Sequence, residues 1–402
     1  MSSIQVYEHE RLKVREKGFQ NSHLEALQRF HGDRGVPYFS LIHNGVKFSQ
    51  FVGVLQVGDL TIQVLPKIDK VEGNEDNWNR VLIDMLRQCG LLTADAPSSS
   101  SLQLKSNSIL ELYFELFILE CEKLVHQGLV KRYRSNEGNL YSLKGSLQFN
   151  KHIQQNLVHA ERFYTRHSIY DHNHLFNGIL RTTLDVLARI NTSSSLSSQI
   201  QRLLLRFPET EKIRPTSKLF NQLQFNRKTE SYRKALDISE LILLNYHPDI
   251  QSGNKDVLAL MFDMNQLWER WVLRQLRKHS PPDIRVKGQQ NKVFWKTPNS
   301  SKRLKPDIAI YKKGIEHPIL IIDTKWKTPK SGRPSDEDLR QIYAYLKMWK
   351  CTKGILLYPG QDEFVSGEYA DVEGSVCEQK KVSVLDGNGR LDGDWGIEIQ
   401  FT

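Results

Sequence analysis

The chain has 402 residues, of which 39% are hydrophobic and 9% aromatic, so it can form two or three globular domains and is not a disordered segment. Its formal net charge is +10, and most of the excess lies between Asp283 and Lys350, where there are sixteen Lys or Arg and seven Asp or Glu residues. This local excess suits a polyanionic partner such as nucleic acid, although a solvated basic face would give the same count.

Four scattered cysteines lack C-x-x-C spacing, which argues against a zinc site or a disulfide framework and fits a reduced, cytoplasmic setting. The first eleven residues are charged where a signal peptide needs an apolar run. The sequence has no apolar stretch of 18 residues, so no membrane partner is expected.

The first segment, residues 1–92, is predicted to be a β-rich domain. Strands are expected at residues 48–55 and 60–65, with a turn near Gly58 between them. A short helix is expected at residues 77–89. Residues 93–108 are rich in Ser, Ala and Pro and are typical of a linker.

The middle segment, residues 109–250, is predicted to be a mainly helical domain. Residues 129–147 are expected to form short extended pieces joined by turns. Helices are expected at residues 109–127, 173–190, 196–205 and 232–244.

The last segment, residues 256–402, is predicted to be a small α/β domain with a mixed sheet, so the chain as a whole is α/β, or α+β over its full length. The pattern predicts a helix at 258–278, strands at 304–311 and 319–326, a helix at 336–349 and a strand at 353–358.

Charged residues collect in this last segment at the ends of apolar strands. Asp307 follows Pro306 in the first strand, and the second strand ends in Asp323 and Lys325. Because strands have a period of two, Asp323 and Lys325 point to the same side of the sheet. Charges at the mouth of a hydrophobic strand are unfavourable unless they pair with each other or with a metal ion.

Two neighbouring carboxylates, Asp307 and Asp323, repel each other, and a divalent cation relieves that repulsion. Mg²⁺, with Mn²⁺ as the alternative, prefers such oxygen ligands and leaves positions free for a phosphate. The backbone carbonyl of Thr324 is a further candidate ligand. Glu269, on the preceding helix, could bind a second metal or hold a ligating water. Lys325 could orient the attacking water, help to deprotonate it, or stabilise the charge that builds up on the phosphate.

Ordinary readings exist for each of these residues taken singly. A D-x-K triplet at a strand end usually forms a surface ion pair, a Pro-Asp pair is common turn chemistry, and most helical glutamates are solvated. The combination of Asp307, Asp323 and Lys325 with a following helix that carries Gln341 and Tyr345 favours phosphodiester hydrolysis.

This combination resembles the active-site hairpin of PD-(D/E)xK nucleases, and the helix with Asp338, Gln341 and Tyr345 resembles the one that follows that hairpin. More narrowly, the chain is similar to the McrC family, the nuclease subunits of McrBC methylcytosine-dependent restriction systems. The similarity is specific in the C-terminal third and looser upstream. It rests on residues 263–269 and 354–359, on 53–55 and 64–68, and on Gly128, Leu129, Tyr133, Lys144, Gly145, Tyr170, Asp171 and Asn177.

The resemblance implies a Mg²⁺-dependent endodeoxyribonuclease that works on DNA with an McrB-like AAA+ GTPase ring. In that family the ring recognises the modified base, and the N-terminal part of McrC stimulates its GTP hydrolysis. The chain has no G-x-x-x-x-G-K-[ST] loop, so no nucleotide site is expected on it. Residues 51–68 are a candidate partner contact, with an ordinary structural hairpin as the equal alternative.

Two other functions fit parts of the same pattern. One is a non-catalytic adaptor that binds DNA through the basic face and activates a motor partner. The other is a PD-(D/E)xK nuclease of DNA repair. Clustered carboxylates would repel DNA without a metal, which favours a nuclease over the adaptor. The family resemblance further implies that the isolated chain does not cut DNA.

Overall fold

The computed structural model describes residues 2–67, 75–91, 109–248, 256–327, 329, 332–360, 364–370, 374–386 and 390–392. The predicted linker at 93–108 and the end of the chain beyond 392 lie outside these residues. The chain forms two compact units, Met1–Lys105 with Met261–Thr402, and Ser106–Leu260. The division into three domains stays a prediction. All four cysteines are free thiols. No helix in the described ranges is long and apolar enough to span a bilayer.

The N-terminal part of the first unit is built on strands β5 (Phe51–Val57) and β6 (Leu60–Leu65), which confirm two predicted strands. They form an antiparallel hairpin, and β1 (Ser2–Tyr7) pairs in parallel with β6. Apart from Phe51, the residues of both strands are buried, whereas Asp59 in the turn between them is exposed. Burial favours the ordinary structural hairpin over a partner contact for residues 51–65; residue 68 lies outside the described part.

Smaller elements complete this part of the unit. A three-stranded sheet has the order β2-β4-β3, and its strands cover Arg11–Lys13, Gly45–Phe48 and Phe39–Ile42. The helices are α1 (Asn21–His31) and α2 (Glu75–Gln88), of which α2 matches the predicted short helix.

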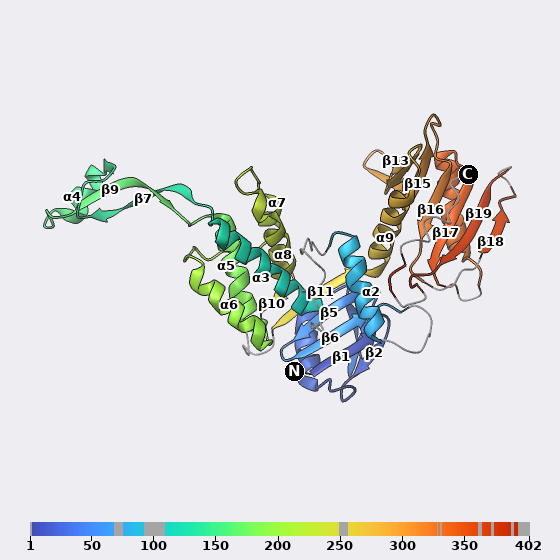
Figure 1. Cartoon of the computed structure of the whole chain (residues 1–402), viewed down its shortest axis with the longest axis horizontal. Coiled ribbons are helices and arrows are strands. Elements are labelled where there is room, and N and C mark those ends of the chain that lie inside the picture. Colours follow the sequence, from blue (N-terminus) through green and yellow to red (C-terminus); the bar gives the residue numbers. More distant parts are fainter. Residues whose placement is uncertain are drawn as a thin grey trace. The chain divides into compact units, whose positions relative to one another are not determined.

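The C-terminal part of the first unit carries a six-stranded mixed sheet with the order β12-β15-β16-β17-β19-β18 (Figure 1). Strands β16, β17 and β19 are parallel, and the other pairs are antiparallel. This confirms the predicted mixed-sheet α/β fold. The strands cover Ile284–Gly288, Ile308–Lys312, Leu320–Thr324, Lys353–Pro359, Val376–Val382 and Phe364–Glu368, in sheet order.

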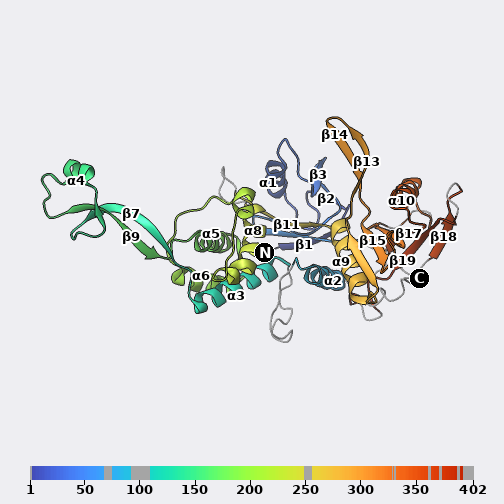
Figure 2. The ribbon, with the colours of Figure 1, turned by 90° about the horizontal axis from the view of Figure 1, so that it is seen from above.

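Two helices cover opposite faces of this sheet. A Cβ on Gly288 would meet Leu273 of α9 (Met264–His279), whereas one on Gly354 would meet Ile342 of α10 (Asp336–Trp349). Gly288 and Gly354 lie on opposite faces because the strand register pairs them with alternating residues of β15 and β16. Strands β13 (Lys292–Thr297) and β14 (Ser300–Leu304) form a separate hairpin that projects from the sheet (Figure 2).

The predicted helix at residues 258–278 is wrong in its first turn and a half. Residues Val257–Asp263 form strand β11, and α9 begins only at Met264. The side chain of Asp263 accepts hydrogen bonds from the amides of Asn265 and Gln266, so it caps the helix at that point. The apolar run before the cap is buried as a strand, which helical spacing alone could not distinguish.

Contacts between distant parts of the sequence hold the first unit together. The indole of Trp326 donates a hydrogen bond of 2.7 Å to Glu8, which also accepts one from the amide of Lys67. Gln88 at the end of α2 accepts hydrogen bonds from Trp271 and Gln275 of α9. The segments before residue 105 and after residue 261 therefore share one hydrogen-bonded core.

The second unit is mainly helical, as predicted. Asn177 is fully buried and donates to the carbonyls of Val130 and His172, while Tyr232 donates to its side-chain oxygen. The helices are α3 (Ile109–Gln127), α5 (Leu175–Ile190), α6 (Ser194–Arg206), α7 (Ser217–Asn221) and α8 (Arg233–Leu244), with the single turn η1 (Glu230–Tyr232) and the short strand β10 (Tyr246–His247).

A long arm extends from these helices (Figure 1). It consists of β7 (Arg132–Leu140) and β9 (Phe163–Asp171), with β8 (Ser146–Leu147) and helix α4 (Phe149–Asn156) at its tip. Within the expected short pieces at 129–147, residues 132–140 form one continuous strand, all nine residues of which pair with β9. The arm exposes apolar side chains: Tyr133, Tyr141, Leu143, Phe149, Ile153, Leu157, Val158 and Tyr170.

Candidate active site

Asp307 lies immediately before β15 and not inside a strand that runs from 304 to 311. Pro306 has no amide hydrogen to donate, and Lys305, Pro306 and Asp307 separate β14 from β15. The carboxylate of Asp307 accepts hydrogen bonds from the amide of Thr324 at 2.7 Å and from its hydroxyl at 2.8 Å. Thr324 therefore fixes Asp307 at the end of β16.

Asp323 and Lys325 lie on the α10 side of the sheet, as the strand period predicted. Asp323 is 1% exposed, and Lys325 Nζ lies 2.8 Å from its Oδ2. Lys325 Nζ also donates a 2.8 Å hydrogen bond to Gln341 Oε1, and Gln341 donates to the hydroxyl of Tyr345. Tyr345 in turn donates to the carbonyl of Lys305. The structure thus brings together Lys325 and both helical residues that the sequence singled out.

The electrostatics of this cluster follow from burial. Burial, and next the charge of Asp307, raise the pKa of Asp323 to about 7, against a lowering effect of Lys325. Burial also raises the pKa of Asp307, while the hydrogen bonds from Thr324 lower it. Burial opposes the charge of Lys325, but the nearby carboxylates, Asp323 first, keep the pKa of its ammonium group above the ordinary value. Two carboxylates are thus held where negative charge is poorly solvated.

Glu269 reaches the same region from α9. Burial and the charge of Asp307 raise the pKa of Glu269, which shows that the two carboxylates are near each other. The side chain of Gln289 donates a hydrogen bond of 2.6 Å to Glu269 Oε1. Its backbone amide donates a second hydrogen bond to the carbonyl of Asp307. Gln289 adopts a positive φ of 52°. It links the helix to the hairpin and was missed from the sequence, where a loop glutamine after a strand carries no signal.

Asp338, which the family resemblance pointed out on α10, contacts two lysines and a tyrosine. It accepts hydrogen-bonded contacts from Tyr358 at 3.0 Å and from Lys327 at 2.6 Å, and Lys325 Nζ lies 3.9 Å from its other oxygen. Ser335 caps α10 through the Asp338 amide. Asp338 is therefore a buried negative charge that balances the positive charges of Lys325 and Lys327.

The residues present fit a divalent cation. Asp323 Oδ2 is buried and has an ion pair with Lys325 but no hydrogen bond of good geometry, so it has capacity for a further ligand interaction. Asp307 and Asp323 supply the carboxylate pair, and the charge of Asp307 acts on Glu269 from nearby. Within the described ranges, no three His, Cys, Asp or Glu side chains form a compact cluster ready to hold a metal. The ligand set Asp307, Asp323, Thr324 and Glu269 stays a prediction.

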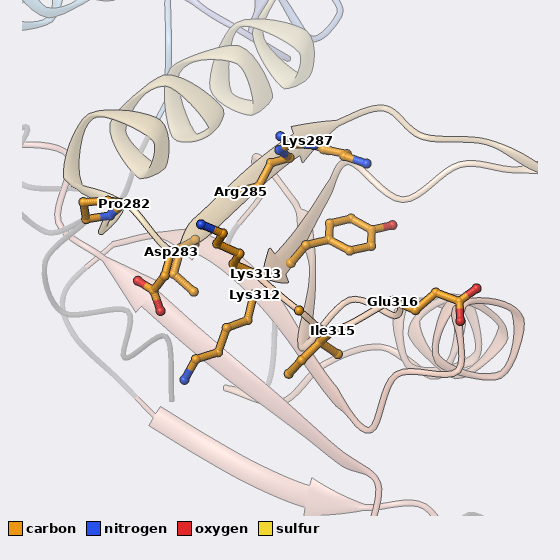
Figure 3. A pocket seen from close by; sticks show the side chains of 11 residues that line it. Pro282, Asp283, Arg285, Lys287, Lys312, Lys313, Ile315 and Glu316 are labelled. Atoms are coloured by element: carbon orange, nitrogen blue, oxygen red, sulfur yellow. The ribbon is translucent and has the colours of Figure 1, made fainter.

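A hollow lies at the other end of β12 and β15 (Figure 3). Ile284 pairs with Lys312 at the hollow, and Gly288 pairs with Ile308 near Asp307, so the two places are about 13 Å apart along the strand. Asp283 and Glu316 lie on opposite sides of the hollow in Figure 3 and do not form a carboxylate pair. The hollow is therefore a separate, largely basic surface feature.

Comparisons with known proteins extend over most of the chain. A family model described as "McrBC 5-methylcytosine restriction system component" matches residues 46–359. The chain is 23% identical over 266 residues to the type IV methyl-directed restriction enzyme EcoKMcrBC of Escherichia coli strain K12, which covers 61% of this chain and 76% of the relative.

Two solved structures share the fold. A half-complex from a tetradecameric assembly of Thermococcus gammatolerans McrB AAA+ hexamers with bound McrC matches with a TM-score of 0.72 and 20% identity, over 98% of both chains. A Thermococcus gammatolerans McrBC complex matches with a TM-score of 0.53 and 19% identity, over 69% of this chain and 88% of the other.

Proposed function

This chain belongs to the family of McrBC 5-methylcytosine restriction system components, and from that premise we propose that it is the DNA-cutting subunit of such a system, a Mg²⁺-dependent endodeoxyribonuclease. One observation carries the proposal: the carboxylates of half-buried Asp307 and buried Asp323 lie close together beside Lys325. A surface that only bound DNA would gain nothing from these charges, because they repel phosphate.

The chain's own residues divide the work of phosphodiester hydrolysis. Asp307, fixed by Thr324, and Asp323 would hold the cation, and Glu269 would support it or a water from the α9 side. When bound, Mg²⁺ supplies Lewis acidity and lowers the pKa of an attacking water. Lys325, oriented by Gln341 and Tyr345, offers its ammonium group to the negative charge that develops on the phosphate.

We further propose that the chain acts with an AAA+ GTPase. One related complex contains McrB AAA+ hexamers with bound McrC, and this chain has no phosphate-binding loop of its own. The exposed apolar residues of the arm are a better candidate contact than the buried β5–β6 hairpin. Phe149, Ile153 and Leu157 follow each other at four-residue spacing around α4 and are 69%, 57% and 80% exposed.

The test is cleavage of methylated and unmethylated plasmid with Mg²⁺, with and without the GTPase partner and GTP. Wild type is compared with Asp323→Asn and with the matched control Asp283→Asn, an exposed aspartate of the same domain. We expect wild type and the control to cut only with the partner and GTP, and Asp323→Asn not to cut.

Each other outcome has a definite meaning. Cutting by Asp323→Asn at the wild-type rate would show that the site is elsewhere. Vigorous cutting by the isolated chain would refute the dependence on the partner. If no protein cuts but all stimulate the GTPase, the adaptor function replaces the nuclease.

A further inference from the structure

The β13–β14 hairpin combines three properties that the proposed site does not use. Every residue of β13 except Thr297, and every residue of β14 except Leu304, is exposed. Segment 292–305 has no Asp or Glu, and its basic residues are Lys292, Lys296, Lys302, Arg303 and Lys305. The aromatic side chains Phe294 and Trp295 are 53% and 50% exposed.

The base of this hairpin is anchored, whereas its outer part is not. Leu304 packs against the core cluster that contains Tyr345 and Trp349. Lys292 Nζ donates to the carbonyl of Met348 and lies 5.0 Å from the ring centre of Trp349. The base of the hairpin is therefore fixed to the domain, and its outer part projects from it.

Further out, the strand register places side chains on defined faces. Trp295 pairs directly with Lys302, so an aromatic ring and an ammonium group share one face. Lys296 pairs with Ser301 on the other face, and the register shifts between Val293 and Trp295, at Phe294. Both faces of the ribbon thus offer a cation.

The chain connects this hairpin directly to the candidate site. Two residues, Lys305 and Pro306, separate the end of β14 from Asp307, and the carbonyl of Lys305 accepts the hydrogen bond from Tyr345. Whatever the hairpin holds is therefore presented next to the carboxylate pair.

We propose that the β13–β14 hairpin is a DNA-contact arm that enters a groove of the duplex and holds the phosphate backbone at Asp307. This inference rests on the proposed nuclease function. A two-stranded ribbon with its side chains fits the major groove of DNA, which is about 12 Å wide. Lys296 and Lys302 contact phosphates, and Phe294 and Trp295 pack on sugars and bases. The occupant is duplex DNA because the ribbon carries positive charge only.

The experiment measures duplex binding by the full chain in EDTA, where no cutting occurs, over a series of salt concentrations. The test variant is Lys296→Ser with Lys302→Ser. The matched control is Lys312→Ser with Lys313→Ser, two exposed lysines at the hollow of Figure 3. A third protein, Phe294→Ser with Trp295→Ser, removes the aromatic rings and no charge. Unchanged thermal unfolding checks that each variant is folded.

We expect the hairpin lysine variant to bind roughly 10- to 100-fold more weakly at 0.1 M salt, with a salt slope smaller by about 1.8, since each lost phosphate contact removes about 0.9. The aromatic variant should bind roughly tenfold more weakly with an unchanged salt slope. The control should bind as wild type does.

A cleavage assay with Mg²⁺, the partner and GTP distinguishes failure of the hairpin proposal from failure of the nuclease proposal. If wild type binds and cuts DNA while the hairpin variants do both equally well, the hairpin proposal is overturned and the nuclease proposal stands. Loss of binding in the Lys312 and Lys313 control instead would move the DNA surface to the hollow and also overturn it. If wild type neither binds nor cuts, the proposed function itself fails.

Discussion

The β15–β16 hairpin lies in the core of the first unit, whereas the β7–β9 hairpin of the second unit is solvated along much of its length. The first carries two poorly solvated carboxylates, buried Asp323 near its end and half-buried Asp307 just before it. The second keeps its charges at the surface, where Glu137 pairs with Lys151 and Arg166, and exposes apolar side chains instead.

The two hairpins depart in opposite ways from the usual pattern, in which apolar side chains are buried and charged ones are exposed. Buried charges and clustered exposed apolar groups are the two unfavourable arrangements that folding alone does not explain. A buried carboxylate pair calls for a cation, and an exposed apolar surface calls for a protein partner. The comparison therefore supports the proposal that one hairpin carries the cutting chemistry and the other contacts the partner, and the following predictions test that separation.

The largest effect is expected for Lys325→Met. Removing the ammonium group takes away charge stabilisation at the phosphate and leaves Asp323 without its ion pair. We expect single-turnover cleavage to fall about 1000-fold. Stimulation of the partner's GTPase should be unchanged, because the arm is intact. A parallel loss of GTPase stimulation would contradict the separation of roles.

The next effect concerns Phe149→Ser with Ile153→Ser on α4. Losing the burial of two large apolar side chains in an interface should weaken partner binding roughly 100-fold. Titration of GTPase stimulation against the concentration of this chain would measure it. Gln154→Ser with Gln155→Ser, two exposed residues of the same helix, is the control. Equal affinities for the two double variants would remove the arm as the contact.

The third prediction concerns Glu8, a buried carboxylate outside the candidate site, and the effect of its titration on stability. Burial raises the pKa of Glu8 to about 7, although Lys67 and Trp326 donate hydrogen bonds to it. Between pH 4.5 and 7 the folded chain binds more protons than the unfolded chain, so stability is lost as the pH rises through this window.

We expect Glu8→Gln to remove a decrease of about 2 kcal/mol in the free energy of unfolding between pH 5 and pH 8. Urea unfolding in EDTA at both values would measure it. Asp323, whose raised pKa acts in the same direction, contributes equally to both proteins and cancels in the comparison. An identical pH dependence in wild type and variant would show that Glu8 does not titrate in this range.

The smallest effect is expected for Tyr345→Phe. The variant leaves Gln341 without its acceptor and loosens the chain of hydrogen bonds that orients Lys325, so cleavage should fall roughly tenfold. Tyr369→Phe is the control. The hydroxyl of Tyr369 donates a hydrogen bond to the carbonyl of Leu339 on the same helix but takes no part in the hydrogen bonds that orient Lys325. A similar decrease in both variants would point to a general loss of stability.

Much of the site could be predicted because its signals are local. A period of two puts Asp323 and Lys325 on one face, and helical spacing puts Gln341 and Tyr345 side by side. Gln289, the bond from Trp326 to Glu8 and the length of β7 could not be predicted in this way. They depend on segments far apart in the sequence, as does the choice of strand over helix for residues 257–263.

The hydrogen bond between Trp326 and Glu8 joins residues 318 positions apart. At typical rates of synthesis, roughly 15 to 60 s pass on the ribosome between the emergence of these two residues. Meanwhile the second unit, which is continuous in the chain, can complete its own core. The carboxylate of Glu8 therefore stays solvated until Trp326, its hydrogen-bond donor, has been synthesised. The segment that is synthesised first is therefore among the last to gain its native contacts.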